Sequence, residues 1–179
     1  MPVLQHWSVL VYALIVALAA ILFFAQLTQF PRTLWVDEAW FGLKGRAVLS
    51  GQNLFPFEVP GSGVGVGNSP FQIYASAAAQ SLGVPAAYSS RAASAAAGLL
   101  TVVLLYPALL VLFRDLLPPA QRAPAALLGT AALATQFVSL FYSRDGSQHA
   151  SCLLATLVVA AGTYLAFERR SRGWAIAAG

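Results

Sequence analysis

The sequence predicts an all-α membrane protein, with about four transmembrane helices and amphipathic surface helices in its first outer loop. Two observations lead to this fold class. Hydrophobic residues make up 59% of the 179-residue chain and charged residues only 9%, against about 25% charged residues in soluble domains. In addition, uncharged apolar stretches recur along the chain at close to the roughly 20 residues that cross a bilayer as a helix. The expected spans are residues 7–27, 92–113, 123–142 and 150–167.

Arginines at the ends of these spans predict the orientation of the chain. Arg114 and Arg122 lie between the second and third spans, and residues 168–172, after the fourth span, contain three more arginines. Because Lys and Arg favour the cytoplasmic side of a membrane, we expect a cytoplasmic N-terminus. A long loop, roughly residues 31–90, and a short loop, residues 143–148, then lie on the outer side.

The long outer loop is expected to contain two helices of its own. Residues 36–50 have apolar side chains at helical spacing with polar ones turned away, which is typical of an amphipathic helix on the outer membrane surface. Residues 70–82 predict a second surface or half-inserted helix. Ser90, Ser94 and Gly98 then place small residues four apart, so their face is expected to pack on another helix rather than on lipid.

Composition also limits the organisation and the class of function. The net charge of +4 does not come from a long basic run, which argues against a nucleic-acid-binding surface. Cys152 is the only cysteine, so no disulfide or cysteine metal site is available. We expect a single membrane domain over residues 1–179. Residues 173–179 look like the opening of a fifth span, so the chain is expected to be a fragment.

Two adjacent acids, Asp37 and Glu38, are the first candidates for chemistry. They follow the first expected span, and a pair of carboxylates there can take a proton from a hydroxyl or bind a divalent cation such as Mg²⁺ or Mn²⁺. No cofactor is otherwise indicated. The structural alternative is that acids in the first turn of a helix favour its dipole and that Asp caps it. Local physics alone favours this alternative.

The second group of candidates lies around the short outer loop. Arg144 offers a planar guanidinium to a phosphate, with Asp145 beside it and His149 near the start of the next helix. Arg91, at the outer end of the second span, could bind a ligand as well. The structural alternatives are an interfacial Arg144 paired with Asp145, an anchoring Arg91, and a His149 that contacts another helix.

Several short motifs also occur in a characteristic order. They are Trp-Val-Asp-Glu-Ala-Trp at 35–40, Ser-Pro-Phe-Gln-Ile-Tyr at 69–74, Ser-Arg at 90–91 and Tyr-Ser-Arg-Asp at 142–145. This order resembles the GT-C membrane glycosyltransferases of the protein-mannosyltransferase and aminoarabinose-transferase type, often labelled RgtA/B/C/D-like in bacteria. The resemblance covers nearly the whole chain. It departs at Ser147 and His149, where the family often has Arg and Tyr.

The resemblance implies the N-terminal part of an enzyme that transfers a sugar from a polyprenyl-phosphate donor to an acceptor hydroxyl, usually with inversion. The transfer would occur at the extracytoplasmic face of the bacterial plasma membrane, to a glycan, lipid or protein. Asp37 matches the acidic position proposed as base or acceptor ligand, and Glu38 is its companion. Arg144 and Asp145 match the Arg-Glu of the family's second outer loop.

Two further expectations concern activity. The 179-residue chain alone is expected to be inactive, because four spans leave an outer site without the helices that would enclose it. The alternative function is a non-catalytic membrane subunit or a fragment of a transporter. A transporter usually places polar residues or broken helices in mid-membrane, whereas these spans contain only a few neutral polar groups.

Overall fold

The computed structural model describes residues 2–29, 33–52 and 69–169, and every regular element in these ranges is an α-helix. The expected all-α architecture is therefore confirmed for this part of the chain. The helices are α1 (Pro2–Phe24), α2 (Val36–Leu49), α3 (Pro70–Ser81), α4 (Ala86–Leu112), α5 (Pro119–Thr135), α6 (Phe137–Tyr142) and α7 (His149–Arg169).

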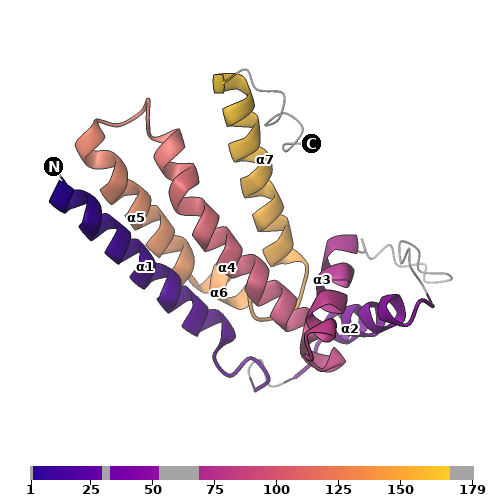
Figure 1. Ribbon diagram of the computed structural model, residues 1–179. Helices are drawn as coiled ribbons and strands as arrows, with labels where there is room; N and C mark the ends of the chain where they lie inside the picture. The colour runs from indigo at the N-terminus through magenta and orange to yellow at the C-terminus, as the bar shows by residue number, and fades with distance from the viewer. Residues whose placement is uncertain (1, 30–32, 53–68, 170–179) are drawn as a thin grey trace.

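The long helices α1, α5, α4 and α7 lie side by side, and the shorter α2 and α3 gather at one end of them (Figure 1). Helix α4 is central, because it packs on α1, α2, α3, α5 and α7. Both segments that the sequence places outside, the one after α1 and loop 143–148, lie at the α2 and α3 end (Figure 1). The side of a membrane that this end faces remains a prediction.

Three of these helices are long and apolar enough to cross a membrane. They are α1 over His6–Phe24 (19 residues), α4 over Ala86–Leu112 (27 residues) and α7 over His149–Glu168 (20 residues). About 20 residues of α-helix extend roughly 30 Å, the thickness of the hydrocarbon core of a bilayer. Large apolar side chains such as Trp7, Leu14 and Ile21 are exposed on α1, as expected for a lipid-facing surface.

The segment expected to form the third span, residues 123–142, is not one continuous helix. Helix α5 is 17 residues long and ends at Thr135, Gln136 has an extended backbone, and α6 follows. In the last turn of α5, the Thr135 hydroxyl donates to the carbonyl of Ala131, a contact that often bends helices. The helix thus stops short of the length of a single span, a break that the uninterrupted apolar pattern of the sequence conceals.

A helix, α2, lies where the amphipathic helix was expected, and the side that it turns to the protein carries one acid, one aromatic ring and two glycines. Its buried residues are Glu38, Phe41, Gly42 and Gly45. Val36 and Leu43, on another side, are 82% and 65% exposed. A helix that turns apolar side chains away from its own protein suits a membrane surface better than water.

Gly42 allows α2 to approach the start of α4 closely. A Cβ atom at this position would collide with the backbone carbonyl oxygen of Ala86, which is rigid. We therefore expect Gly42→Leu to destabilise the fold by about 1–3 kcal/mol, the usual cost of overpacking. Thermal unfolding in detergent micelles would measure this, with the same enlargement at the less buried Ala47 as control. Equal midpoints for the two variants would contradict the close approach.

Candidate functional site

The two adjacent acids have different environments. Asp37 is exposed to solvent, whereas the side chain of Glu38 is completely buried. Helix α2 begins at Val36, and the backbone N–H of Trp35 donates to Oε2 of Glu38 at 3.0 Å. The capping role that the sequence suggested for Asp37 is thus taken by Glu38. Asp37 is the carboxylate that remains accessible to a substrate.

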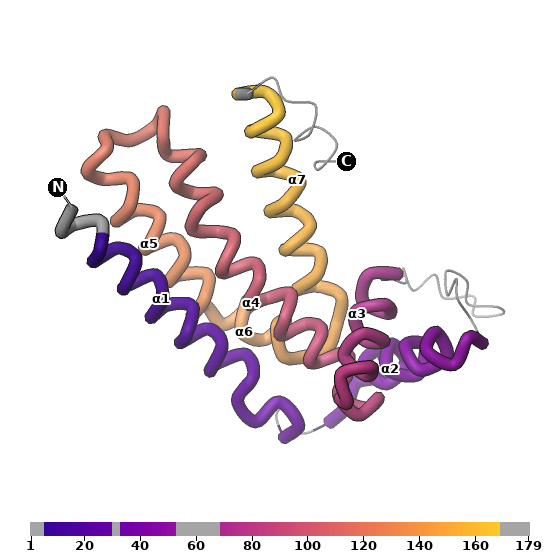
Figure 2. The backbone as a smooth tube through the Cα atoms, in the orientation of Figure 1, coloured from indigo at the N-terminus to yellow at the C-terminus, as the bar shows by residue number. Residues whose placement is uncertain are grey.

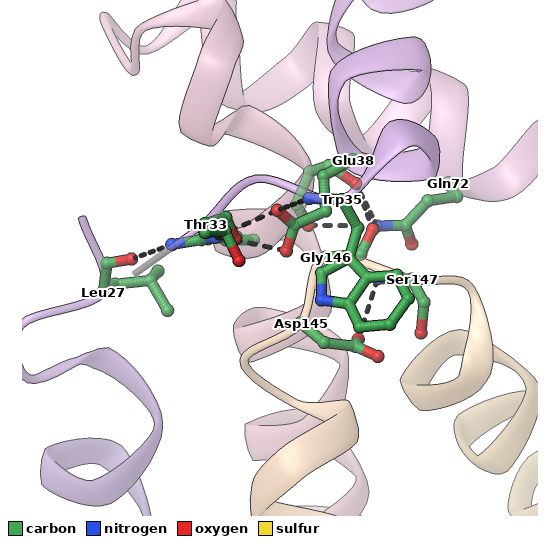
Figure 3. A network of polar contacts seen from close by, with 10 residues as sticks. Leu27, Thr33, Trp35, Glu38, Gln72, Asp145, Gly146 and Ser147 are labelled. Carbon is green, nitrogen blue, oxygen red and sulfur yellow. Dashed lines mark hydrogen bonds and ion pairs between the residues drawn. The ribbon is translucent and has the colours of Figure 1, made fainter. Parts of the chain in front are cut away.

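Glu38 forms a bidentate ion pair with Arg91 of α4. The Arg91 Nε donates to Oε1 of Glu38 and Nη2 donates to Oε2, each at 3.0 Å, and both side chains are 1% exposed. Arg91 also donates to the backbone carbonyls of Leu27 at 3.2 Å and Thr33 at 2.8 Å. The guanidinium therefore fastens α2 and the end of the α1 segment to α4 (Figure 3).

Burial makes this ion pair sensitive to change. Taking two charges out of water is costly, and removing one partner of such a pair typically costs about 3–5 kcal/mol. Burial raises the pKa of Glu38, while hydrogen bonds from Arg91 and from the Trp35 amide act in the opposite direction. In this structure Arg91 is a structural link, and its expected role as a substrate ligand remains a prediction.

A second arginine holds the carboxyl end of α1. The Arg144 guanidinium donates to the carbonyl of Leu22 at 2.5 Å and to that of Ala25 at 2.9 Å. The last carbonyls of a helix lack partners within the helix and carry partial negative charge, so a cation is favourable there. Arg144 therefore connects loop 143–148 to α1, and its expected role in binding a phosphate remains a prediction.

Loop 143–148 rests directly against the ion pair. Gly146 has φ of 71°, and a Cβ atom there would lie 2.8 Å from Cγ of Glu38. A side chain is thus excluded both by the left-handed backbone and by the contact. The carbonyl of Gly146 accepts the hydroxyl of Ser90, and that of Ser147 accepts the hydroxyl of Ser94 at 2.7 Å.

Asp145 and His149 lie on either side of this turn. Asp145 is 8% exposed, and its Oδ1 accepts the backbone N–H of Ser147 at 2.9 Å. Burial raises the pKa of Asp145, and Ser147, His149 and Arg91 oppose that rise. His149 is the first residue of α7, exposed, with its ring 4.4 Å from that of Tyr142.

Gln72 is the residue of this region that the sequence analysis did not single out. Its side chain is fully buried, and its Nε2 donates to Ser94 Oγ at 3.0 Å and to the Gly146 carbonyl at 3.3 Å. Its Oε1 accepts the hydroxyl of Ser151 at 2.8 Å. One amide therefore joins α3, α4, α7 and the loop. The only signal in the sequence was its place inside the motif at residues 69–74.

The small-residue face of α4 was predicted correctly. Ser90 and Ser94 are fully buried, and a Cβ atom at Gly98 would collide with the side chain of Ser143. This face packs on α3, through Gln72, and on the loop, not on lipid.

The structure thus brings five of the six candidate residues into one connected region: Glu38, Arg91, Arg144, Asp145 and His149. Asp37 borders this region on the solvent side of α2. Within the described ranges, no cluster of three or more His, Cys, Asp or Glu side chains has the arrangement of a metal site. The expected cation at Asp37 and Glu38 remains a prediction; since both oxygens of the buried Glu38 accept hydrogen bonds, Asp37 would need further ligands from the substrate or from water.

Comparisons with protein-family models, with curated proteins and with solved structures give no match for this chain.

The different environments of the two acids predict opposite effects of neutralising them. Glu38→Gln removes the carboxylate charge that faces the buried Arg91 guanidinium, so we expect a loss of about 3–5 kcal/mol of stability. Asp37→Asn changes an exposed group and should stay within about 0.5 kcal/mol. Thermal or denaturant unfolding of both variants in the same detergent would measure the difference. If the two variants unfold alike, the ion pair does not hold the fold together.

Proposed function

We propose that this chain is the N-terminal part of a membrane glycosyltransferase, which moves a sugar from a polyprenyl-phosphate donor to an acceptor hydroxyl. The observation that supports it best is the pairing of an exposed carboxylate with a rigid support. Asp37 is accessible, while the next residue, Glu38, is locked to Arg91. A general base must be both accessible and held in place, because misplacement by about 1 Å can cost 100-fold in rate.

In the proposed reaction the acceptor hydroxyl attacks the anomeric carbon of the donor sugar. The proton of the hydroxyl passes to the Asp37 carboxylate as the new carbon–oxygen bond forms. The bond between the anomeric carbon and the phosphate oxygen breaks, and its electron pair leaves with the lipid phosphate. Attack from the face opposite the leaving group inverts the configuration at that carbon.

The leaving phosphate gains negative charge and needs a cation nearby. Arg144 is the candidate that lies at the same end of the helices and is partly exposed. Its guanidinium donates to the carbonyls of Leu22, in α1, and of Ala25, just after α1, so its charge would act there without the side chain moving. A divalent cation bound by Asp37 and the donor phosphate would supply the same stabilisation.

The position of the polar residues supports a reaction at the membrane surface over transport. Glu38, Arg91 and loop 143–148 lie at one end of the long helices (Figure 1). A transport path would more naturally place such groups halfway along α1, α4 or α7. The outward apolar face of α2 also suits a helix that lies along the membrane surface beside such a site.

The sharpest test of this function is Asp37→Asn in membranes that contain the whole protein to which the chain belongs. Asn removes the basicity but leaves the shape and the Glu38–Arg91 pair unchanged. We expect normal expression and a fall in sugar transfer of roughly 100-fold or more, the scale of losing a general base. Transfer of a radiolabelled sugar from its lipid-linked donor would be the measurement.

The matched control is Asp115→Asn, which neutralises another exposed acid, at the opposite end of α4. This variant should retain normal transfer. Near-normal turnover in Asp37→Asn would show that Asp37 is not the general base. Equal losses of transfer in both variants would indicate a general effect of surface charge.

The proposed orientation has its own test. Single cysteines at Gln52, which follows α2, and at Leu116, which follows α4, both exposed, are introduced into a Cys152→Ser background. An impermeant thiol reagent should label position 52 from the extracytoplasmic side and position 116 from the cytoplasmic side. Labelling of both positions from one side would contradict the proposed orientation and the crossing of the membrane by α4.

A further inference from the structure

An apolar groove of about 430 Å³ separates α4 from α7. Its walls are aliphatic over most of their length, with Leu104, Ala108 and Leu112 on α4 and Leu157, Ala161 and Leu165 on α7. The two helices diverge away from the α2 and α3 end (Figure 2), so the groove lies in their far halves. It is separate from the candidate site, which occupies the other end.

Both ends of the groove are closed by contacts. Toward the candidate site, Ala97 packs against Ala150 and Leu154. At the far end, the Tyr164 hydroxyl donates to Asp115 at 3.1 Å, and Arg114 forms an ion pair with Glu168 at 2.9 Å. These side chains keep the ends of α4 and α7 connected although the groove separates the helices. Because the lining is almost entirely apolar, an apolar occupant of the groove is favoured over water.

The charges at the far end indicate the chemistry of that occupant. The Arg114 side chain is 60% exposed and uses only Nη1 in its contact with Glu168. Its remaining N–H groups can donate to a phosphate. Asp115 and Glu168 supply two carboxylates beside it. A positive group flanked by negative ones matches a headgroup that contains both a phosphate and a primary ammonium.

We propose that the groove binds one acyl chain of an aminophospholipid, phosphatidylethanolamine, whose phosphate pairs with Arg114 and whose ammonium pairs with Asp115 and Glu168. The site depends only on α4 and α7 lying in a bilayer, and not on the proposed glycosyl transfer. Lipid bound there fills the space between the helices and adds a further link between their ends. It therefore stabilises the bundle on the side opposite the candidate site.

The test is a lipid titration of the full chain in detergent, followed by native mass spectrometry. Phosphatidylethanolamine, phosphatidylglycerol and phosphatidylcholine with identical acyl chains are compared. We expect one tightly held phosphatidylethanolamine, preferred by roughly tenfold over the other two, because only its ammonium donates charge-assisted hydrogen bonds to the carboxylates. Equal binding of the three lipids, or a preference for phosphatidylglycerol, would overturn the assignment of the headgroup.

Variants separate the parts of the site. Ala161→Phe fills the groove and should abolish tight binding of all three lipids, whereas Val159→Phe, on an exposed part of α7 outside the groove lining, should not. Arg114→Gln should weaken all three lipids. Asp115→Asn can still accept the Tyr164 hydroxyl and should remove only the preference for phosphatidylethanolamine.

If Ala161→Phe does not fold, Ala108→Phe fills the groove from the opposite wall and should likewise abolish tight lipid binding. Unchanged binding in a folded groove-filling variant would overturn the proposal. That result would mean that the lipid binds elsewhere or that protein occupies the groove.

Discussion

The arrangement of this protein depends on one buried ion pair, between Glu38 of α2 and Arg91 of α4. Its two hydrogen bonds fix α2 on α4, and the other donors of the same guanidinium reach Leu27 and Thr33 in the connection from α1. Three segments distant in sequence therefore meet at one charge. In an apolar environment such a charge has few alternative partners, so the pair specifies which helices meet and in which register.

The polar network around the ion pair explains how an apolar chain obtains a unique packing. Leucine and alanine surfaces in a bilayer gain little by meeting each other rather than lipid. Directional contacts through Gln72, Ser90 and Ser94 instead select one arrangement of α3, α4 and the loop. Specificity thus comes from a few small polar side chains at one end, while the apolar lengths of α1, α4 and α7 provide the membrane-compatible surface.

The sequence predicts the helices well because apolar runs and helical spacing are local signals. It does not predict which of Asp37 and Glu38 is buried, because neighbours on a helix point about 100° apart and only the partner decides. That partner, Arg91, lies 53 residues away. The bonds of Gln72 are equally long-range. The break at Gln136 was also hidden, since one neutral residue hardly alters an apolar run.

The way in which loop 143–148 is attached has a consequence for how this protein could diversify. Ser90 and Ser94 hold the loop by the main-chain oxygens of Gly146 and Ser147. These two hydrogen bonds use backbone oxygens of the loop, so they do not depend on which side chains the loop carries. These two contacts would therefore survive changes of the half-buried side chains of Ser147 and Gln148, provided that position 146 stays glycine. Main-chain anchoring thus leaves the identity of these two side chains open to change, as in loops that a rigid scaffold positions.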